Sequence, residues 1–164
     1  MRWTGLLVLV VLLGRVPEGW FDVQVRAQSA LDDVRANAEA GLASAQRRLG
    51  LMYAGGRGVE QDDAEAAGWF RRAGEQGEPR AQASLGFSYA LGKGVPLDYV
   101  EAYRWLDLAV VRSSGENREL FQRNREAVAT KMTAAEVINA KRLARDWRAT
   151  HRVGRSGVAR SREY

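Results

Sequence analysis

The chain of 164 residues contains no cysteine and only one histidine, His151. The absence of cysteine excludes disulfide bonds, thiolate catalysis and cysteine-based metal sites. A single histidine cannot form a multi-histidine metal centre, and His151 lies near the C-terminus with no evident partner in the sequence. We therefore predict no metal, no cofactor and no catalytic residue.

The sequence also lacks an apolar run long enough to cross a bilayer. The unbroken apolar run at residues 6–13 spans eight residues, whereas a membrane-spanning helix needs about 20. Arg2 precedes this run, and Ala27 ends a small-residue cleavage motif after it. This order is typical of a signal peptide, so we predict that residues 1–27 are one. Cleavage near Ala27 would leave a periplasmic or secreted protein.

An uncleaved membrane anchor is the alternative for this segment. The segment of residues 14–24 is longer and more charged than the cleavage region of a typical signal peptide. Trp20 and Phe21 would prolong an interfacial segment that stays on the membrane. The sequence leaves both possibilities open.

The formal net charge is +5, and much of the excess lies near the C-terminus. We predict that residues 151–164 form a disordered basic tail, because they hold no apolar stripe. Aromatic residues do not interleave with its arginines, as a platform for stacking bases would require. We therefore expect no nucleic-acid partner, and membrane contact only through the N-terminal segment or this tail.

What the chain does contain is an internal repeat. Residues 41–76 align with residues 77–112 without a gap, and 15 of the 36 positions are identical. Chance would give about two or three identities. A period of this length indicates stacked supersecondary units. We predict an all-α solenoid of antiparallel helix pairs, with both repeats inside a domain over residues 28–150.

Each repeat contains the residues that typically start and end two helices. In the first, a helix is predicted over residues 42–54 and ends at Gly56, where a left-handed residue is free of strain. Gly50 inside that helix indicates that a neighbouring helix approaches its backbone closely. The second helix is predicted to begin at Asp62, a helix-capping residue. Its buried stripe, with the second-repeat equivalents, comprises Ala66, Trp69, Phe70, Ala73, Ala102, Trp105, Leu106 and Ala109.

Atypical half-repeats are predicted to seal both ends, at residues 29–40 and 113–150. Ser29 is expected to cap the N-terminal one. In the C-terminal one, a helix over residues 116–131 is expected to bury Leu120, Phe121 and Val128. A capping box from Thr133 to Glu136 then starts the last helix.

Three features that resemble active sites have simpler structural explanations. The Gly-x-Gly pairs at Gly56 and Gly92 lack the Lys-Ser/Thr or strand context of a phosphate loop, so we interpret them as turns. The acids that begin at Asp62 lack the offsets of a cation loop, so we interpret them as caps. Trp69 and Trp105 are expected in the core, with ligand stacking as the alternative.

The repeated pattern, G-x3-A-Q-x2-L-G-x2-Y-x2-G-x-G-V-x2-D-x2-E-A-x2-W-x3-A, resembles the Sel-one-like repeat (SLR) family, which is related to tetratricopeptide repeats. The pattern lies over Gly41 to Ala73 and again over Gly77 to Ala109. The resemblance implies an α-solenoid that acts as a scaffold or adaptor in bacterial regulation and envelope processes. A cysteine-rich branch is associated with β-lactams, but the lack of cysteine here speaks against transferring that activity.

In related tetratricopeptide proteins, the first helix of each unit lines the concave ligand-binding face. Carried onto this chain through Leu49, Gly50 and Tyr53, the predicted partner-binding positions are Ser44, Arg47, Leu51, Ala54, Arg80, Ala83, Phe87 and Ala90. The arginines would pair with carboxylates of a peptide, and Leu51 and Phe87 would offer apolar contacts. A merely solvated face is the alternative.

The sequence as a whole therefore predicts a non-enzymatic, monomeric module that binds a protein or peptide partner in the bacterial envelope. Two alternatives stay open. One is a weak cell-wall hydrolase or β-lactamase-like enzyme, which would need paired carboxylates or an activated serine in a cleft. The other is a membrane-tethered adaptor whose basic tail lies on anionic lipid.

Overall fold

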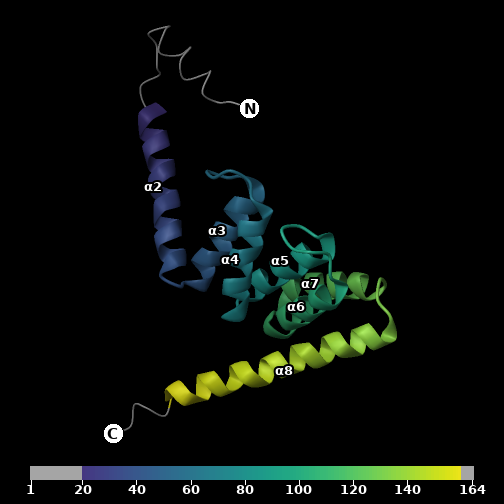
Figure 1. The fold of residues 1–164 in the computed structure, drawn as a ribbon. Helices are drawn as coiled ribbons and strands as arrows, with labels where there is room; N and C mark the ends of the chain where they lie inside the picture. Colours follow the sequence, from purple (N-terminus) through teal and green to yellow (C-terminus); the bar gives the residue numbers. More distant parts are fainter. Residues whose placement is uncertain (1–19, 160–164) are drawn as a thin grey trace. The chain divides into compact units, whose positions relative to one another are not determined.

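The computed structural model describes residues 20–159, and within them every regular element is an α-helix (Figure 1). This confirms the predicted fold class. The helices are α2 (Trp20–Glu39), α3 (Ala43–Gly55), α4 (Asp63–Glu75), α5 (Pro79–Leu91), α6 (Tyr99–Arg112), α7 (Gly115–Ala129) and α8 (Ala134–Ala159). The chain divides into two compact units, Met1–Asp33 and Val34–Tyr164, and both repeats belong to the second.

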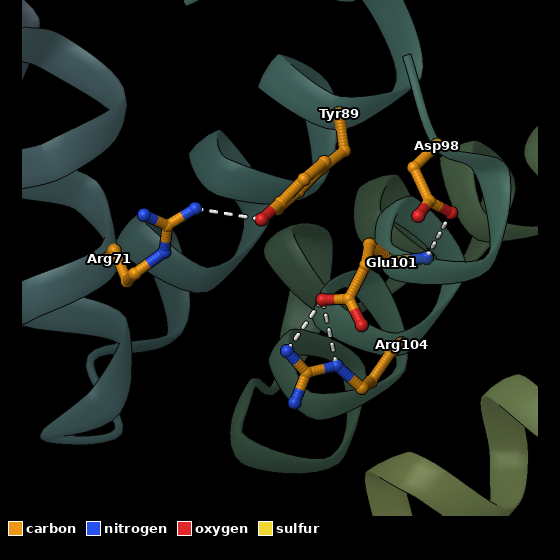
Figure 2. A network of polar contacts seen from close by, with 5 residues as sticks. All are labelled: Arg71, Tyr89, Asp98, Glu101 and Arg104. Atoms are coloured by element: carbon orange, nitrogen blue, oxygen red, sulfur yellow. Dashed lines mark hydrogen bonds and ion pairs between the residues drawn. The ribbon is translucent and has the colours of Figure 1, made fainter. Parts of the chain in front are cut away.

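The first repeat forms the hairpin α3–α4 and the second forms the hairpin α5–α6. The second helix of each hairpin begins where the sequence predicts. Asp62 Oδ1 accepts hydrogen bonds from the backbone N–H groups of Ala64 (2.9 Å) and Glu65 (3.0 Å). Asp98 Oδ1 accepts the equivalent bond from Glu101 at 3.0 Å (Figure 2). The acids are thus helix caps, as expected.

The loops inside the two hairpins are also equivalent. Gly56 and Gly92 end α3 and α5 with φ angles of 62° and 64°, which glycine adopts without a Cβ clash. Each loop then closes on the helix it left. The backbone N–H of Asp62 donates to Tyr53 O at 3.0 Å, and that of Asp98 donates to Tyr89 O at 3.1 Å. The glycine pairs are therefore turn residues.

The hairpin helices meet at a glycine in each repeat. A Cβ on Gly50 would lie 2.6 Å from Phe70 Cε1 and 3.1 Å from the Ala66 carbonyl oxygen. A Cβ on Gly86 would lie 2.8 Å from Leu106 Cγ. All three distances are shorter than ordinary van der Waals contact, so the predicted close approach is confirmed.

Buried glutamines join each repeat to the helix before it. Gln46 Nε2 donates to Ala38 O at 3.1 Å, and Gln82 Nε2 donates to Gly74 O at 2.9 Å. Each of these carbonyl groups lies at a helix end and also accepts a backbone hydrogen bond, from Gly41 N or Gly77 N, so the glutamine adds a second bond. The predicted core stripes of α4 and α6 are buried, and the Trp69 and Trp105 side chains belong to that core.

The C-terminal half-repeat follows the sequence in part. Phe121 and Val128 are buried, but Leu120 is 44% exposed, so its predicted burial is wrong. The capping box is confirmed, because Glu136 Oε2 accepts from Thr133 N at 2.7 Å and Glu136 N donates to Thr133 Oγ1. Hydrogen bonds from the backbone and then the side chain of Thr133 lower the pKa of Glu136.

The N-terminal half-repeat differs at its start, because α2 begins at Trp20 and Ser29 lies inside it. Ser29 is therefore not a helix cap. Residues 1–19 of the predicted signal peptide lie outside the described residues, as do residues 160–164 of the predicted tail. The backbone of residues 151–159 continues α8, while the side chains after His151 lie outside the description. The predicted disorder of the tail stays a prediction.

We expect Gly50→Ala to lower the free energy of unfolding by about 1–3 kcal/mol, because the new methyl group overlaps the Phe70 ring. Gly68→Ala is the matched control, since no atom lies within 4 Å of a Cβ placed there in α4. That control should raise stability by up to about 1 kcal/mol through helix propensity. Urea denaturation measures both, and equal stabilisation by the two changes would contradict the close contact.

Candidate functional site

The second unit has an apolar cleft where α3, α4 and α5 meet. Its volume is about 200 Å³. Ala66 and Phe70 of α4 are almost fully buried and form its base, whereas Leu51 and Leu91 are 42% and 65% exposed and lie at its rim. The full lining consists of Leu51, Ala54, Asp63, Ala66, Phe70, Ser84, Phe87, Ser88, Leu91 and Lys93.

Two glycine contacts position this cleft. The contact of Gly50 with Phe70 brings α3 against α4 and holds the Phe70 ring beneath Leu51 and Ala54. Gly94, with φ of 70°, lies so close to the Asp63 carbonyl that a Cβ would overlap it. The loop after α5 is therefore pressed against the first turn of α4, which places Lys93 beside the cleft.

The structure separates the predicted partner-binding residues into two groups. Leu51, Ala54 and Phe87 line the cleft together, at the junction of the two repeats. Ser44 and Arg80 are exposed on α3 and α5 but do not line it. As a binding set these residues stay a prediction.

The remaining predicted positions are occupied by contacts within the protein. Arg47 Nε lies 3.6 Å from Glu78 Oε2. Ala83 is buried, with 2% of its surface exposed, and Ala90 packs against the same core cluster. The side chains of these three residues are therefore less available to a partner than their positions on the helices predicted.

Sequence reasoning missed part of the cleft. The base comes from α4, which was expected only to fill the core. Leu91 is the last residue of α5 and lies four residues beyond Phe87, but it was not among the positions carried over from the tetratricopeptide pattern. Helical spacing from Phe87 was the signal that could have found both residues, because Leu91 lies at i+4 and Ser84 at i−3.

Apart from the cleft, a cluster of polar side chains joins α6 to the two helices after it. Asp107 is 8% exposed, and its carboxylate pairs with Arg125 of α7 at 2.7 Å and with Arg148 of α8 at 3.4 Å. Tyr103 lies beside it, and burial raises the pKa of that phenol while Arg125 opposes the rise. The sequence did not single out Asp107. We interpret it as the junction that docks the C-terminal half-repeat.

The equivalent position of the first repeat makes a different contact. It holds Arg71, whose Nη2 donates to the Tyr89 hydroxyl oxygen at 2.7 Å across the repeat boundary (Figure 2). Arg104 of the second repeat, whose counterpart in the first repeat is Gly68, donates to Glu101 Oε2 at 2.6 Å within α6. The bond from Arg71 therefore joins α4 to α5.

His151 has partners, contrary to the prediction from sequence. Its ring stacks on Trp147 with centroids 3.7 Å apart, and its Nδ1 lies 2.8 Å from Trp147 O. Among the described residues, no three His, Asp or Glu side chains gather closely enough to hold a metal ion. In the same part of the chain, no helix is both long and apolar enough to span a bilayer.

Comparisons with known proteins agree with this architecture. The Sel1 repeat family model matches residues 43–78 and 79–110. A solved protective antigen present in uropathogenic Escherichia coli strains, described as displaying an SLR fold, is 37% identical over 72% of this chain, with a TM-score of 0.67. A solved Sel1 repeat protein from Oxalobacter formigenes is 40% identical over 55% of this chain, with a TM-score of 0.51.

This chain spans 25% of the length of the Escherichia coli protein and 68% of that of the Oxalobacter formigenes protein. No curated protein matches it.

Asp107→Asn should lower the free energy of unfolding by about 1–3 kcal/mol, because both arginines lose a charged partner. Their partial exposure keeps the loss below that of a fully buried pair. Asp146→Asn is the control, since its pair with Arg142 is more than half exposed, and it should change stability by at most about 0.5 kcal/mol. Hydrogen exchange should locate the loss in α7 and α8, and unchanged protection there would refute the junction.

Proposed function

The chain belongs to the Sel1 repeat family, and we propose that it is a non-enzymatic module that binds a protein or peptide partner in the cleft between α3, α4 and α5. The observation that carries the proposal is the apolar cleft with Leu51 and Leu91 exposed at its rim. Sel1 repeats generally mediate interactions between proteins.

The energetics of the cleft favour this function. Full burial of one leucine side chain contributes about 1.5–3 kcal/mol, and Leu91 keeps 65% of its surface in water. Phe87 adds a half-buried aromatic ring beside it. A partner that inserts an apolar side chain would remove Leu51, Leu91 and Phe87 from water at once, and such anchor residues dominate the binding energy of interfaces.

The enzymatic alternative has less support. A hydrolase of the expected kind needs paired carboxylates or an activated serine. In the described cleft the lining includes one carboxylate, Asp63, whose place in the first turn of α4 is favourable for a helix N-terminus. Ser84 and Ser88 lie on α5, and His151 is stacked on Trp147 of α8.

We also propose that the module acts in the bacterial envelope. The support is the N-terminal order of a positive residue, an apolar run at residues 6–13 and the cleavage motif ending at Ala27. Export would place the cleft among envelope proteins.

Leu51→Asp should abolish capture of the partner, because an apolar side chain of the partner would then have to remove a carboxylate at the rim from water. Leu120→Asp is the matched control, since Leu120 of α7 is 44% exposed and Leu51 is 42% exposed. The experiment is cross-linking and co-purification from the native host, with circular dichroism to verify the fold. Equal capture by both variants would remove the cleft from the interface.

Export is tested separately. The intact mass of the protein from the periplasmic fraction should correspond to a chain that begins at Gln28. A full-length mass in the membrane fraction would favour the uncleaved anchor, and a full-length mass in the cytoplasm would refute export.

A further inference from the structure

Three cations stand around the cleft without a partner in the part of the chain that the structure describes. Lys93 lines the cleft. Arg48 lies three residues before Leu51 on α3, and Arg80 lies two helical turns before Phe87 on α5, so each shares a helix face with a cleft residue. All three side chains are exposed. None makes an ion pair or a side-chain hydrogen bond with a described residue.

Several other arginines of the second unit have defined structural contacts. Arg47 pairs with Glu78, Arg104 with Glu101, and Arg125 with Asp107, while Arg71 donates to a tyrosine hydroxyl. The Glu78 carboxylate also caps α5, so its charge is already compensated. Asp63 is then the one carboxylate in the lining, and it stands at a helix N-terminus. The lining therefore holds one cation, Lys93, and one carboxylate, Asp63, while Arg48 and Arg80 add two positive charges on the adjoining helix faces.

We propose that the partner segment bound here is acidic, with one large apolar side chain flanked by carboxylates. The apolar side chain fills the cleft of about 200 Å³, and the flanking carboxylates pair with Arg48, Arg80 and Lys93. This inference rests on the proposed function, because it names the chemistry of the partner at the same cleft. Complementary charge around an apolar anchor speeds association and selects the partner.

A protein segment fits these observations better than other anions do. Six of the ten lining residues carry aliphatic or aromatic side chains, which match an apolar amino-acid side chain. A nucleic acid would need successive exposed aromatic faces for its bases. The two aromatic residues of the lining do not offer them, because Phe70 is buried and Phe87 is half-buried. An anion bound by charge alone would not need the apolar base formed by Ala66 and Phe70.

The test is fluorescence anisotropy on the purified chain with three labelled peptides. The first has a central phenylalanine flanked by aspartates and glutamates, the second replaces the acids with lysines, and the third replaces the phenylalanine with glycine. We expect micromolar binding of the first alone, weakened by added salt because the cations are exposed. Arg48→Glu with Arg80→Glu should weaken it by about tenfold or more.

The matched control is Lys141→Glu with Arg145→Glu, which changes the net charge equally on the exposed face of α8. It should alter the affinity by less than about twofold. Thermal melts verify that both double variants are folded.

The outcomes separate this inference from the proposed function. Equal binding of the lysine peptide, with loss on Leu51→Asp, would overturn the acidic partner but keep the cleft as the site. Equal binding of the glycine peptide, of single-stranded DNA or of phosphatidylglycerol vesicles would overturn the apolar anchor. Absence of binding by the acidic peptide at millimolar concentration would also overturn the inference, while co-purification with Leu51→Asp would still decide the proposed function.

Discussion

The rest of the domain depends on the contact between the two helices of each hairpin. With only hydrogen at Gly50, the backbone of α3 comes within van der Waals reach of the Phe70 ring and the Ala66 carbonyl group. Gly86 makes the same approach to Leu106 and Ala102. An internal glycine lowers the stability of a helix by about 1 kcal/mol relative to alanine. We infer that the close packing it permits stabilises the hairpin by more than this amount. It also fixes the Phe70 ring under the cleft, so architecture and candidate site share one contact.

The identical positions of the two repeats are those that build and stack hairpins. Gln46 and Gln82 bond to the end of the preceding helix, and Asp62 and Asp98 cap the helix that follows. Such contacts recur because each unit meets the next in the same geometry. The differing positions meet surroundings that do not recur. Where Arg71 reaches the next repeat, its equivalent Asp107 meets the arginines of the C-terminal half-repeat.

This division explains how far sequence could predict the structure. Helix starts and stops follow from local chemistry, so Asp62, Gly56 and the Thr133 capping box were predictable from a few neighbouring residues. The burial of a side chain at the end of a solenoid depends on a single, unrepeated neighbour. Leu120 satisfied the helical periodicity yet remains exposed, because a periodic stripe says which residues share a face and not what covers it.

The candidate site could also be predicted only in part from the sequence. Leu51 and Phe87 could be placed in it because both lie on first helices, at equivalent positions. Its charge could not be deduced from composition, since Arg47 and Arg48 are adjacent in sequence but only Arg47 has a carboxylate beside it. An unpaired cation keeps its full hydration, whereas a paired one has already exchanged part of it for a protein contact. The unpaired cations near the cleft can therefore still form ion pairs with a partner. The apolar base of the cleft favours an anion that is accompanied by an apolar side chain.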